Sequence, residues 1–128
     1  MDDLKADDLV IRVDRSAPAC LRLDWEGSGN SESPGKILVP FFEKVLSEAK
    51  EGGCLVDMHF EELAYFNSSA IASLIHLVYA AGKASVALGI HYDPARKWQS
   101  LAFEALKRVL PMVASAERPK VEFFSTRS

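Results

Sequence analysis

The architecture can be worked out from residues 64–78, which read Ala-Tyr-Phe-Asn-Ser-Ser-Ala-Ile-Ala-Ser-Leu-Ile-His-Leu-Val. The segment begins as a loop with two aromatic residues, of which we expect Phe66 to lie in the core and Tyr65 outside. Asn-Ser-Ser at 67–69 is typical of a turn that caps a helix. The almost wholly apolar residues that follow predict a helix pressed against a sheet. Any chemistry is therefore expected at this turn.

Strands and helices alternate on both sides of this segment, as the periodicity of apolar residues indicates. The expected strands cover residues 8–13, 19–25, 54–60, 84–92 and 121–124. The expected helices are one that Pro40 can open and Gly52-Gly53 closes, the one after the turn that Gly82 ends, and one that Pro94 opens and Pro111 helps to stop. Residues 27–35, rich in Gly and Ser, are expected to form a mobile loop.

This order of elements decides the fold class. Strands that alternate with helices favour parallel neighbours joined by right-handed crossovers, whereas the first two strands form an antiparallel hairpin. The sequence therefore predicts an α/β fold with a mixed sheet, made of an N-terminal antiparallel hairpin and parallel strands alternating with helices.

Composition indicates one soluble domain spanning residues 1–128, because 48% hydrophobic and 26% charged residues are ordinary globular values. Lys and Arg are not gathered into a stripe and the net charge is -3, which argues against nucleic acid as a partner. No apolar run approaches the roughly 20 residues that cross a bilayer, so we expect no membrane association and a cytoplasmic location. Cys20 and Cys54 stand in apolar runs and are expected to behave as small hydrophobes.

The side chains of Asn67, Ser68 and Ser69 have an ordinary role and a functional one. Each can cap the helix, which is the common role of such residues before an apolar helix. The functional reading uses the same geometry, because the amino end of a helix tolerates a phosphate. Phosphorylation would add about -1.5 to -2 charges and block a partner surface that needs a free hydroxyl.

Three runs together resemble the STAS domain of bacterial anti-sigma factor antagonists: Leu55-Val56-Asp57-Met58-His59-Phe60, Phe66-Asn67-Ser68-Ser69-Ala70-Ile71, and Leu74-Ile75. Members of that family carry a strand ending in an aspartate, a short loop, and Asp-Ser-Ser-Gly-Leu opening an apolar helix. The resemblance covers the central third closely, and the order of elements fits nearly the whole chain. It implies a non-enzymatic regulatory binding module in signal transduction and transcription regulation, with no cofactor.

The resemblance also implies a switch and its partners. In the family, a partner ATP-binding serine kinase that doubles as an anti-sigma factor phosphorylates the serine at the position of Ser68, and a serine phosphatase reverses it. The unphosphorylated form binds the kinase. Carried over, Ser68 is the expected phosphorylation site, with Ser69 second. The expected partner-binding residues are Tyr65, Asn67, Ser68 and Asp57.

Two residues depart from the family motif. Asn67 replaces the aspartate, which keeps a capping oxygen but loses the charge that a kinase can read. Ala70 replaces the glycine and fills space near a partner's backbone. These departures leave open an alternative in which the domain binds or oligomerises without phosphorylation.

An enzyme of another class, a small hydrolase or a metal-binding enzyme, is the remaining alternative. His59 and His91 end two strands expected to be neighbours, with Asp57, Glu61 and Glu62 close in sequence, yet no two of them show a recognised metal spacing. The sequence therefore predicts no metal site. A serine of the turn with a histidine and Asp57 could form a hydrolytic site, but the Gly-x-Ser-x-Gly elbow is absent, so catalysis is not predicted.

Overall fold

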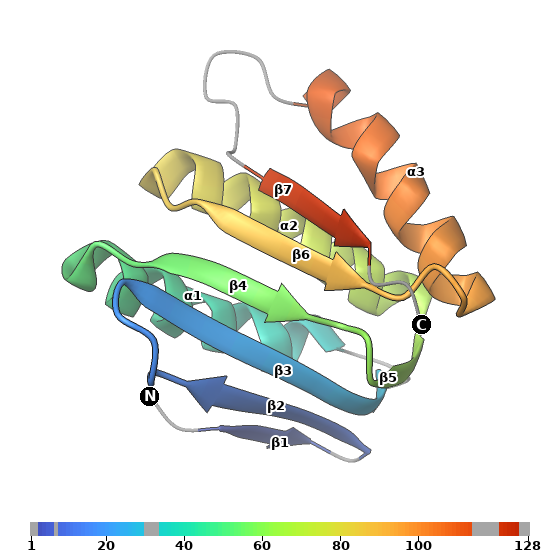
Figure 1. Cartoon of the computed structure of the whole chain (residues 1–128), viewed down its shortest axis with the longest axis horizontal. Coiled ribbons are helices and arrows are strands. Elements are labelled where there is room, and N and C mark those ends of the chain that lie inside the picture. The colour runs from blue at the N-terminus through green and yellow to red at the C-terminus, as the bar shows by residue number, and fades with distance from the viewer. Residues whose placement is uncertain (1–2, 7, 30–33, 114–120, 126–128) are drawn as a thin grey trace.

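A computed structural model describes residues 3–6, 8–29, 34–113 and 121–125 (Figure 1). In chain order, its elements are β1 (Leu4–Ala6), β2 (Leu9–Asp14), β3 (Cys20–Gly29), α1 (Pro34–Gly52), β4 (Leu55–His59), β5 (Leu63–Phe66), α2 (Ser68–Ala84), β6 (Leu88–Tyr92), α3 (Lys97–Val113) and β7 (Val121–Ser125). The predicted α/β class is confirmed. No helix among the described residues is long and apolar enough to cross a membrane.

The described strands form one mixed sheet in the order β1-β2-β3-β4-β6-β7, with β5 beside the end of β3. Both pairs at the amino end, β1 with β2 and β2 with β3, are antiparallel. The pairs β3–β4, β4–β6 and β6–β7 are parallel. The predicted hairpin and parallel strands are therefore confirmed, and β1 adds a short antiparallel strand that the sequence did not predict.

The helices pack on one face of this sheet. Helices α1 and α2 lie behind it in Figure 1, and Phe103 of α3 reaches the same core. Alternate residues of the central strands, such as Val56 and Met58, are fully buried in that core. Because successive side chains of a strand point to opposite faces, Asp57 projects from the face that none of the described helices covers.

Trp25 of β3 stands at the centre of the core. Its indole is fully buried, and its ring centroid lies 4.9 Å from that of Phe60, 5.5 Å from that of Phe66 and 5.9 Å from that of Phe42. These four rings join β3, β5, α1 and the residue after β4. Apolar packing of this size supplies most of a small domain's stability.

The limits of the first helix differ from the prediction. Helix α1 begins at Pro34, so Pro40 lies inside it instead of opening it, although the predicted end at Gly52 is confirmed. The expected loop at 27–35 is likewise wrong for 27–29, which belong to β3, and for 34–35, which belong to α1. Residues 30–33 lie outside the described part of the chain.

The ends of the other helices also shift. Helix α2 passes through Gly82 and ends at Ala84, and Ser85 takes the left-handed cap with φ of 59°. Glycine inside a helix costs only about 1 kcal/mol, so packing of the last turn overrides it. Residues 93–96 form a turn instead of the start of α3, because Asp93 Oδ1 accepts the Ala95 N–H at 2.9 Å.

The sequence predicts an apolar face of α3 made of Trp98, Leu101, Ala102, Ala105, Leu106 and Val109. Leu101 and Ala105 are instead exposed, whereas Phe103, which is outside that set, is buried. Helix α3 continues to Val113, past Pro111.

The Cys20 thiol is expected to alkylate slowly at neutral pH. Burial, and next the nearby Asp57 carboxylate, raise the pKa of Cys20, so less of it is the reactive thiolate at pH 7. The rate of reaction with iodoacetamide, followed by mass spectrometry in a Cys54→Ser variant, should rise severalfold when the chain is unfolded in urea. Equal rates for the folded and unfolded chains would contradict this account.

Candidate functional site

Asn67 caps helix α2, and this leaves the two serines after it exposed. The Asn67 backbone is extended, with φ of -77° and ψ of 169°, and its Oδ1 accepts the N–H of Ala70 at 2.8 Å. Its carbonyl accepts the N–H of Ile71 at 3.0 Å. Ser68 and Ser69 are exposed, and within the described chain neither hydroxyl forms a hydrogen bond. The capping role therefore belongs to Asn67 alone.

This arrangement suits a phosphoryl acceptor. The first N–H groups of an α-helix have no partner inside the helix and carry a positive partial charge. Ser68 and Ser69 are the first two residues of α2, and its first turn has no acidic side chain that would repel a phosphate. A phosphate on either hydroxyl would lie at the positive end of the helix.

The aromatic residues before the turn form a strand, not the expected loop. Strand β5 pairs in parallel with the end of β3, where Tyr65 lies opposite Ser28. Phe66 is buried, whereas the side chain of Tyr65 is 49% exposed, with its ring centroid 6.4 Å from that of Trp98. The predicted inside and outside positions of Phe66 and Tyr65 are confirmed. An exposed tyrosine thus stands three residues from Ser68.

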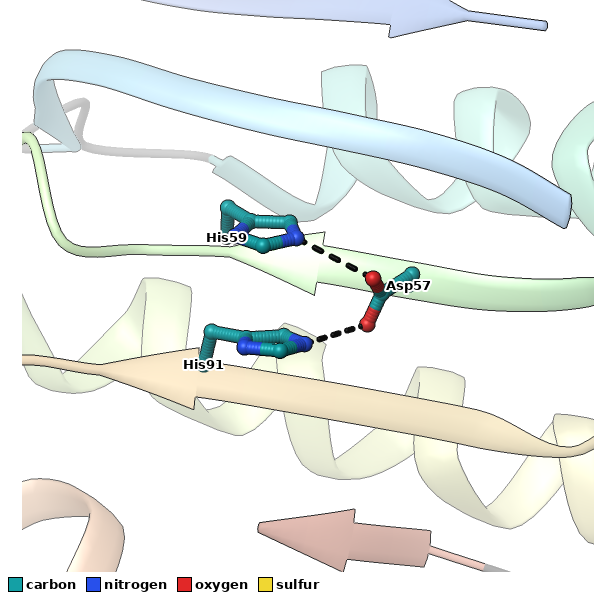
Figure 2. Close-up of side chains that lie close together, drawn as sticks. All are labelled: Asp57, His59 and His91. Carbon is teal, nitrogen blue, oxygen red and sulfur yellow. Dashed lines mark hydrogen bonds and ion pairs between the residues drawn. The ribbon is translucent and has the colours of Figure 1, made fainter. Parts of the chain in front are cut away.

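The structure places Asp57 away from this turn. It is the third of the five residues of β4 and not the end of the strand. Its side chain projects from the open face of the sheet, as Figure 2 shows, whereas the helices lie on the other face. Its hydrogen-bond partners are His59 and His91. A partner contact at Asp57 remains a prediction, on a surface separate from Ser68.

Asp57, His59 and His91 form a cluster on the open face, shown in Figure 2. The Nε2 atom of His91 lies 2.7 Å from Asp57 Oδ1, and that of His59 lies 3.1 Å from Oδ2. The expectation that His59 and His91 lie on neighbouring strands is confirmed, because they are opposite each other in the β4–β6 register. Their rings stack with centroids 3.9 Å apart.

Carboxylate and aromatic side chains surround this cluster. Glu61 Oε1 lies 3.1 Å from His59 Nδ1, and the Phe124 ring stacks on His91 with centroids 4.6 Å apart. Among the described residues, Asp57, His59 and His91 are the one group of three or more whose ligand atoms lie close enough for a metal ion. Glu62, also named from the sequence, is exposed and stands outside this group.

The sequence matches no protein-family model and no curated protein. Solved structures do match. SiaC of Pseudomonas aeruginosa is 20% identical over 100% of both chains, with a TM-score of 0.62. A chain in the crystal structure of the diguanylate cyclase SiaD in complex with its activator SiaC, from the same organism, is 16% identical with a TM-score of 0.59, over 97% of this chain and 98% of that one.

This chain has a STAS-like fold. The mixed sheet with its antiparallel hairpin is the architecture that the residue motif predicted. At identities of 16% and 20%, the likeness extends to the fold alone. What the STAS-like domain does depends on its own residues.

The STAS-like domain has a further positioning residue that sequence reasoning missed. Gln99 of α3 is fully buried. Its Nε2 donates to the carbonyls of Phe60 at 2.7 Å and Leu63 at 3.1 Å, and its Oε1 accepts the N–H of Asp93 at 2.7 Å. These bonds hold the turn between β4 and β5. Its spacing from Phe103, four residues along the same helix, could have placed this polar residue on the buried face.

Proposed function

We propose that this domain is a non-enzymatic regulatory module that binds a partner enzyme, and that phosphorylation of Ser68 switches the binding. The observation that carries the proposal is the exposed Ser68 hydroxyl at the first position of α2, left free because Asn67 caps the helix. An ordinary capping serine would have its oxygen engaged by a backbone N–H. Ser68 is instead accessible to another protein.

Ser68 is preferred over Ser69 because it is the first residue of α2, next to the cap residue. It follows Asn67 directly and is closer in sequence to the exposed Tyr65. Aromatic side chains are enriched at protein interfaces, so Tyr65, Asn67 and Ser68 form the proposed contact surface. A phosphate of about -1.5 to -2 charges would place a bulky anion in the middle of such a contact.

The proposed partner is a serine kinase of the ATP-binding type that doubles as an anti-sigma factor, opposed by a serine phosphatase. The STAS motif supports this choice. SiaC, which shares the fold, is the activator of the diguanylate cyclase SiaD. The anti-sigma factor antagonists and SiaC therefore both act by binding an enzyme directly. A diguanylate cyclase is therefore the second partner to test.

A substitution series at the turn tests the proposal. The kinases, phosphatases and diguanylate cyclases encoded in the same genome as this chain are the candidates for binding. Some partner is expected to bind the unmodified chain. We expect Ser68→Asp to lower the affinity for that partner on the order of tenfold or more, about 1.4 kcal/mol of binding free energy. Ser69→Asp is the matched control, because it places the same charge one residue further along the helix.

The same proteins give the modification test. Incubation with the partner kinase and ATP should add one phosphate to the wild type and to Ser69→Ala, and none to Ser68→Ala, as intact mass shows. If Ser68→Asp binds as tightly as the wild type, the contact does not include this turn. If Ser68→Ala is still phosphorylated, the site assignment is wrong.

A further inference from the structure

We propose that Asp57, His59 and His91 bind one zinc-class divalent metal ion on the open face of the sheet. The site lies on the face opposite α2, so it goes beyond the proposed function and does not depend on it. Two imidazoles and one carboxylate form the mixed nitrogen and oxygen donor set that suits zinc. Each ligand comes from a strand of the sheet, which fixes its backbone.

The ligand atoms are close enough for one ion to draw them together. The ligand atoms of the three residues all lie within 4.8 Å of one another. Tetrahedral zinc, with bonds of about 2.0 to 2.2 Å, holds two ligand atoms about 3.3 to 3.6 Å apart. Binding therefore requires the side chains to turn inward from the positions they have without a metal.

The hydrogen bonds of His59 point to the same conclusion. Both of its ring nitrogens face carboxylates, Nε2 toward Asp57 and Nδ1 toward Glu61, each at 3.1 Å. With a metal ion at Nε2, the Nδ1–H of His59 would donate to Glu61. A carboxylate behind a ligating histidine is the usual support of such a ligand.

Gly89 makes room for the carboxylate. It lies opposite Asp57 in the β4–β6 register, and a Cβ on Gly89 would lie 2.6 Å from Asp57 Oδ1. Glycine inside a strand often marks a site where another group approaches closely. Here that group is the carboxylate oxygen nearest His91.

The basic side chain opposite Asp57 is paired with another carboxylate, so the negative charge of Asp57 can attract a cation. Arg22 lies opposite Asp57 on β3, but its guanidinium pairs with Asp24, with Nη2 3.0 Å from Oδ1. Asp57 and His91 also line a groove of about 650 Å³, through which water can reach the ion and complete its coordination. The Phe124 ring stacks on His91, with centroids 4.6 Å apart.

Metal titration of the full chain, made without a histidine tag and stripped with a chelator, tests the site. We expect one Zn²⁺ per chain in competition with a chromophoric chelator, and a visible absorption band with Co²⁺. Mg²⁺ and Ca²⁺, which prefer oxygen ligands, should not compete. His59→Gln and His91→Gln should lose more than the 10- to 100-fold in affinity that a supporting residue typically contributes.

Three further variants make the result specific. His76→Gln removes an exposed histidine from α2, and zinc affinity should not change. Glu61→Gln should lower the affinity for zinc on the order of tenfold. Gly89→Ala should also lower it, because the added methyl group displaces the Asp57 carboxylate although every ligand residue is still present. Circular dichroism shows whether each variant is folded. If the histidine variants do not fold, the zinc affinities of Glu61→Gln and Gly89→Ala test the site in their place.

Two results would overturn the proposal. One is a wild-type chain that binds no Zn²⁺ at micromolar free concentration, and the other is unchanged affinity in folded His59→Gln or His91→Gln. Ser68→Asp should bind zinc as the wild type does, so failure of the switch and failure of the metal site are distinguishable.

Discussion

Replacing Gly27 with alanine is expected to lower the free energy of unfolding by about 4 kcal/mol. Gly27 has φ of +85°, and an added Cβ would lie 1.7 Å from the carbonyl oxygen of Asp8. That carbonyl also accepts the N–H of Ser28 at 3.1 Å. The clashing oxygen belongs to the main chain and cannot turn aside as a flexible side chain can, so β2 and β3 must separate where they pair. Urea unfolding followed by circular dichroism measures the loss.

Gly53→Ala is the matched control for this substitution. Gly53 also has a positive φ, of +64°, but no atom lies within 4 Å of the added Cβ. Only the left-handed backbone then opposes alanine, at a cost of about 1 to 2 kcal/mol. If both variants lost the same free energy of unfolding, Gly27 would not lie as close to the Asp8 carbonyl as the structure has it.

Gln99→Leu is expected to cost about 3 kcal/mol, the second largest effect. The substitution keeps most of the side-chain volume but removes three hydrogen bonds, to Phe60, Leu63 and Asp93. Backbone groups that lose a buried partner cost about 1 to 3 kcal/mol each. The N–H of Leu63, which donates to Phe60 O at 2.9 Å, should also exchange its hydrogen faster, because the turn loses its support.

Ser100→Ala is the control at the next position of α3. The Ser100 side chain forms no hydrogen bond with a described residue, so the change in stability should stay within about 0.5 kcal/mol. Thermal unfolding of the two variants gives the comparison. A Gln99→Leu protein as stable as Ser100→Ala would show that Gln99 does not hold the turn between β4 and β5.

The sequence predicted the elements whose signal is local. The apolar run of β4 and the apolar helix α2 follow from periodicity, and the Asn-Ser-Ser turn follows from capping chemistry. Strand β5 was missed because its four residues do not alternate: Leu63 and Phe66 are buried, and the two between them are exposed. Only its pairing with β3, distant in the chain, makes it a strand.

The start of α3 shows a second limit of local signals. Asp93-Pro94 is compatible both with a helix start and with a turn. The structure has the turn, in which the N–H of Asp93 is bonded to Gln99. That bond depends on how α3 packs against the sheet, and the dipeptide alone carries no information about packing.

The candidate sites, too, could be predicted only where the signal is local in the sequence. A cap at residues 67–69 could be predicted from the order of residues, but not that Asn67 would supply it and leave the two serines exposed. The sequence placed His59 and His91 on neighbouring strands with Asp57 close in the chain, but the contact of Asp57 with both rings depends on the β4–β6 register, which the spacing does not give. It also did not point to Gly89, whose missing side chain matters only once Asp57 lies beside it.

The central claim is that Ser68 is a phosphorylation switch for partner binding. The most direct measurement is the intact mass and the fragment spectrum of the chain isolated from its own cells across growth conditions, together with the proteins that remain bound to each form. The account predicts a single phosphate on Ser68 in part of the population, and a partner enzyme retained by the unphosphorylated form alone. Absence of phosphate from Ser68 in every condition, or equal retention of the partner by both forms, would contradict it.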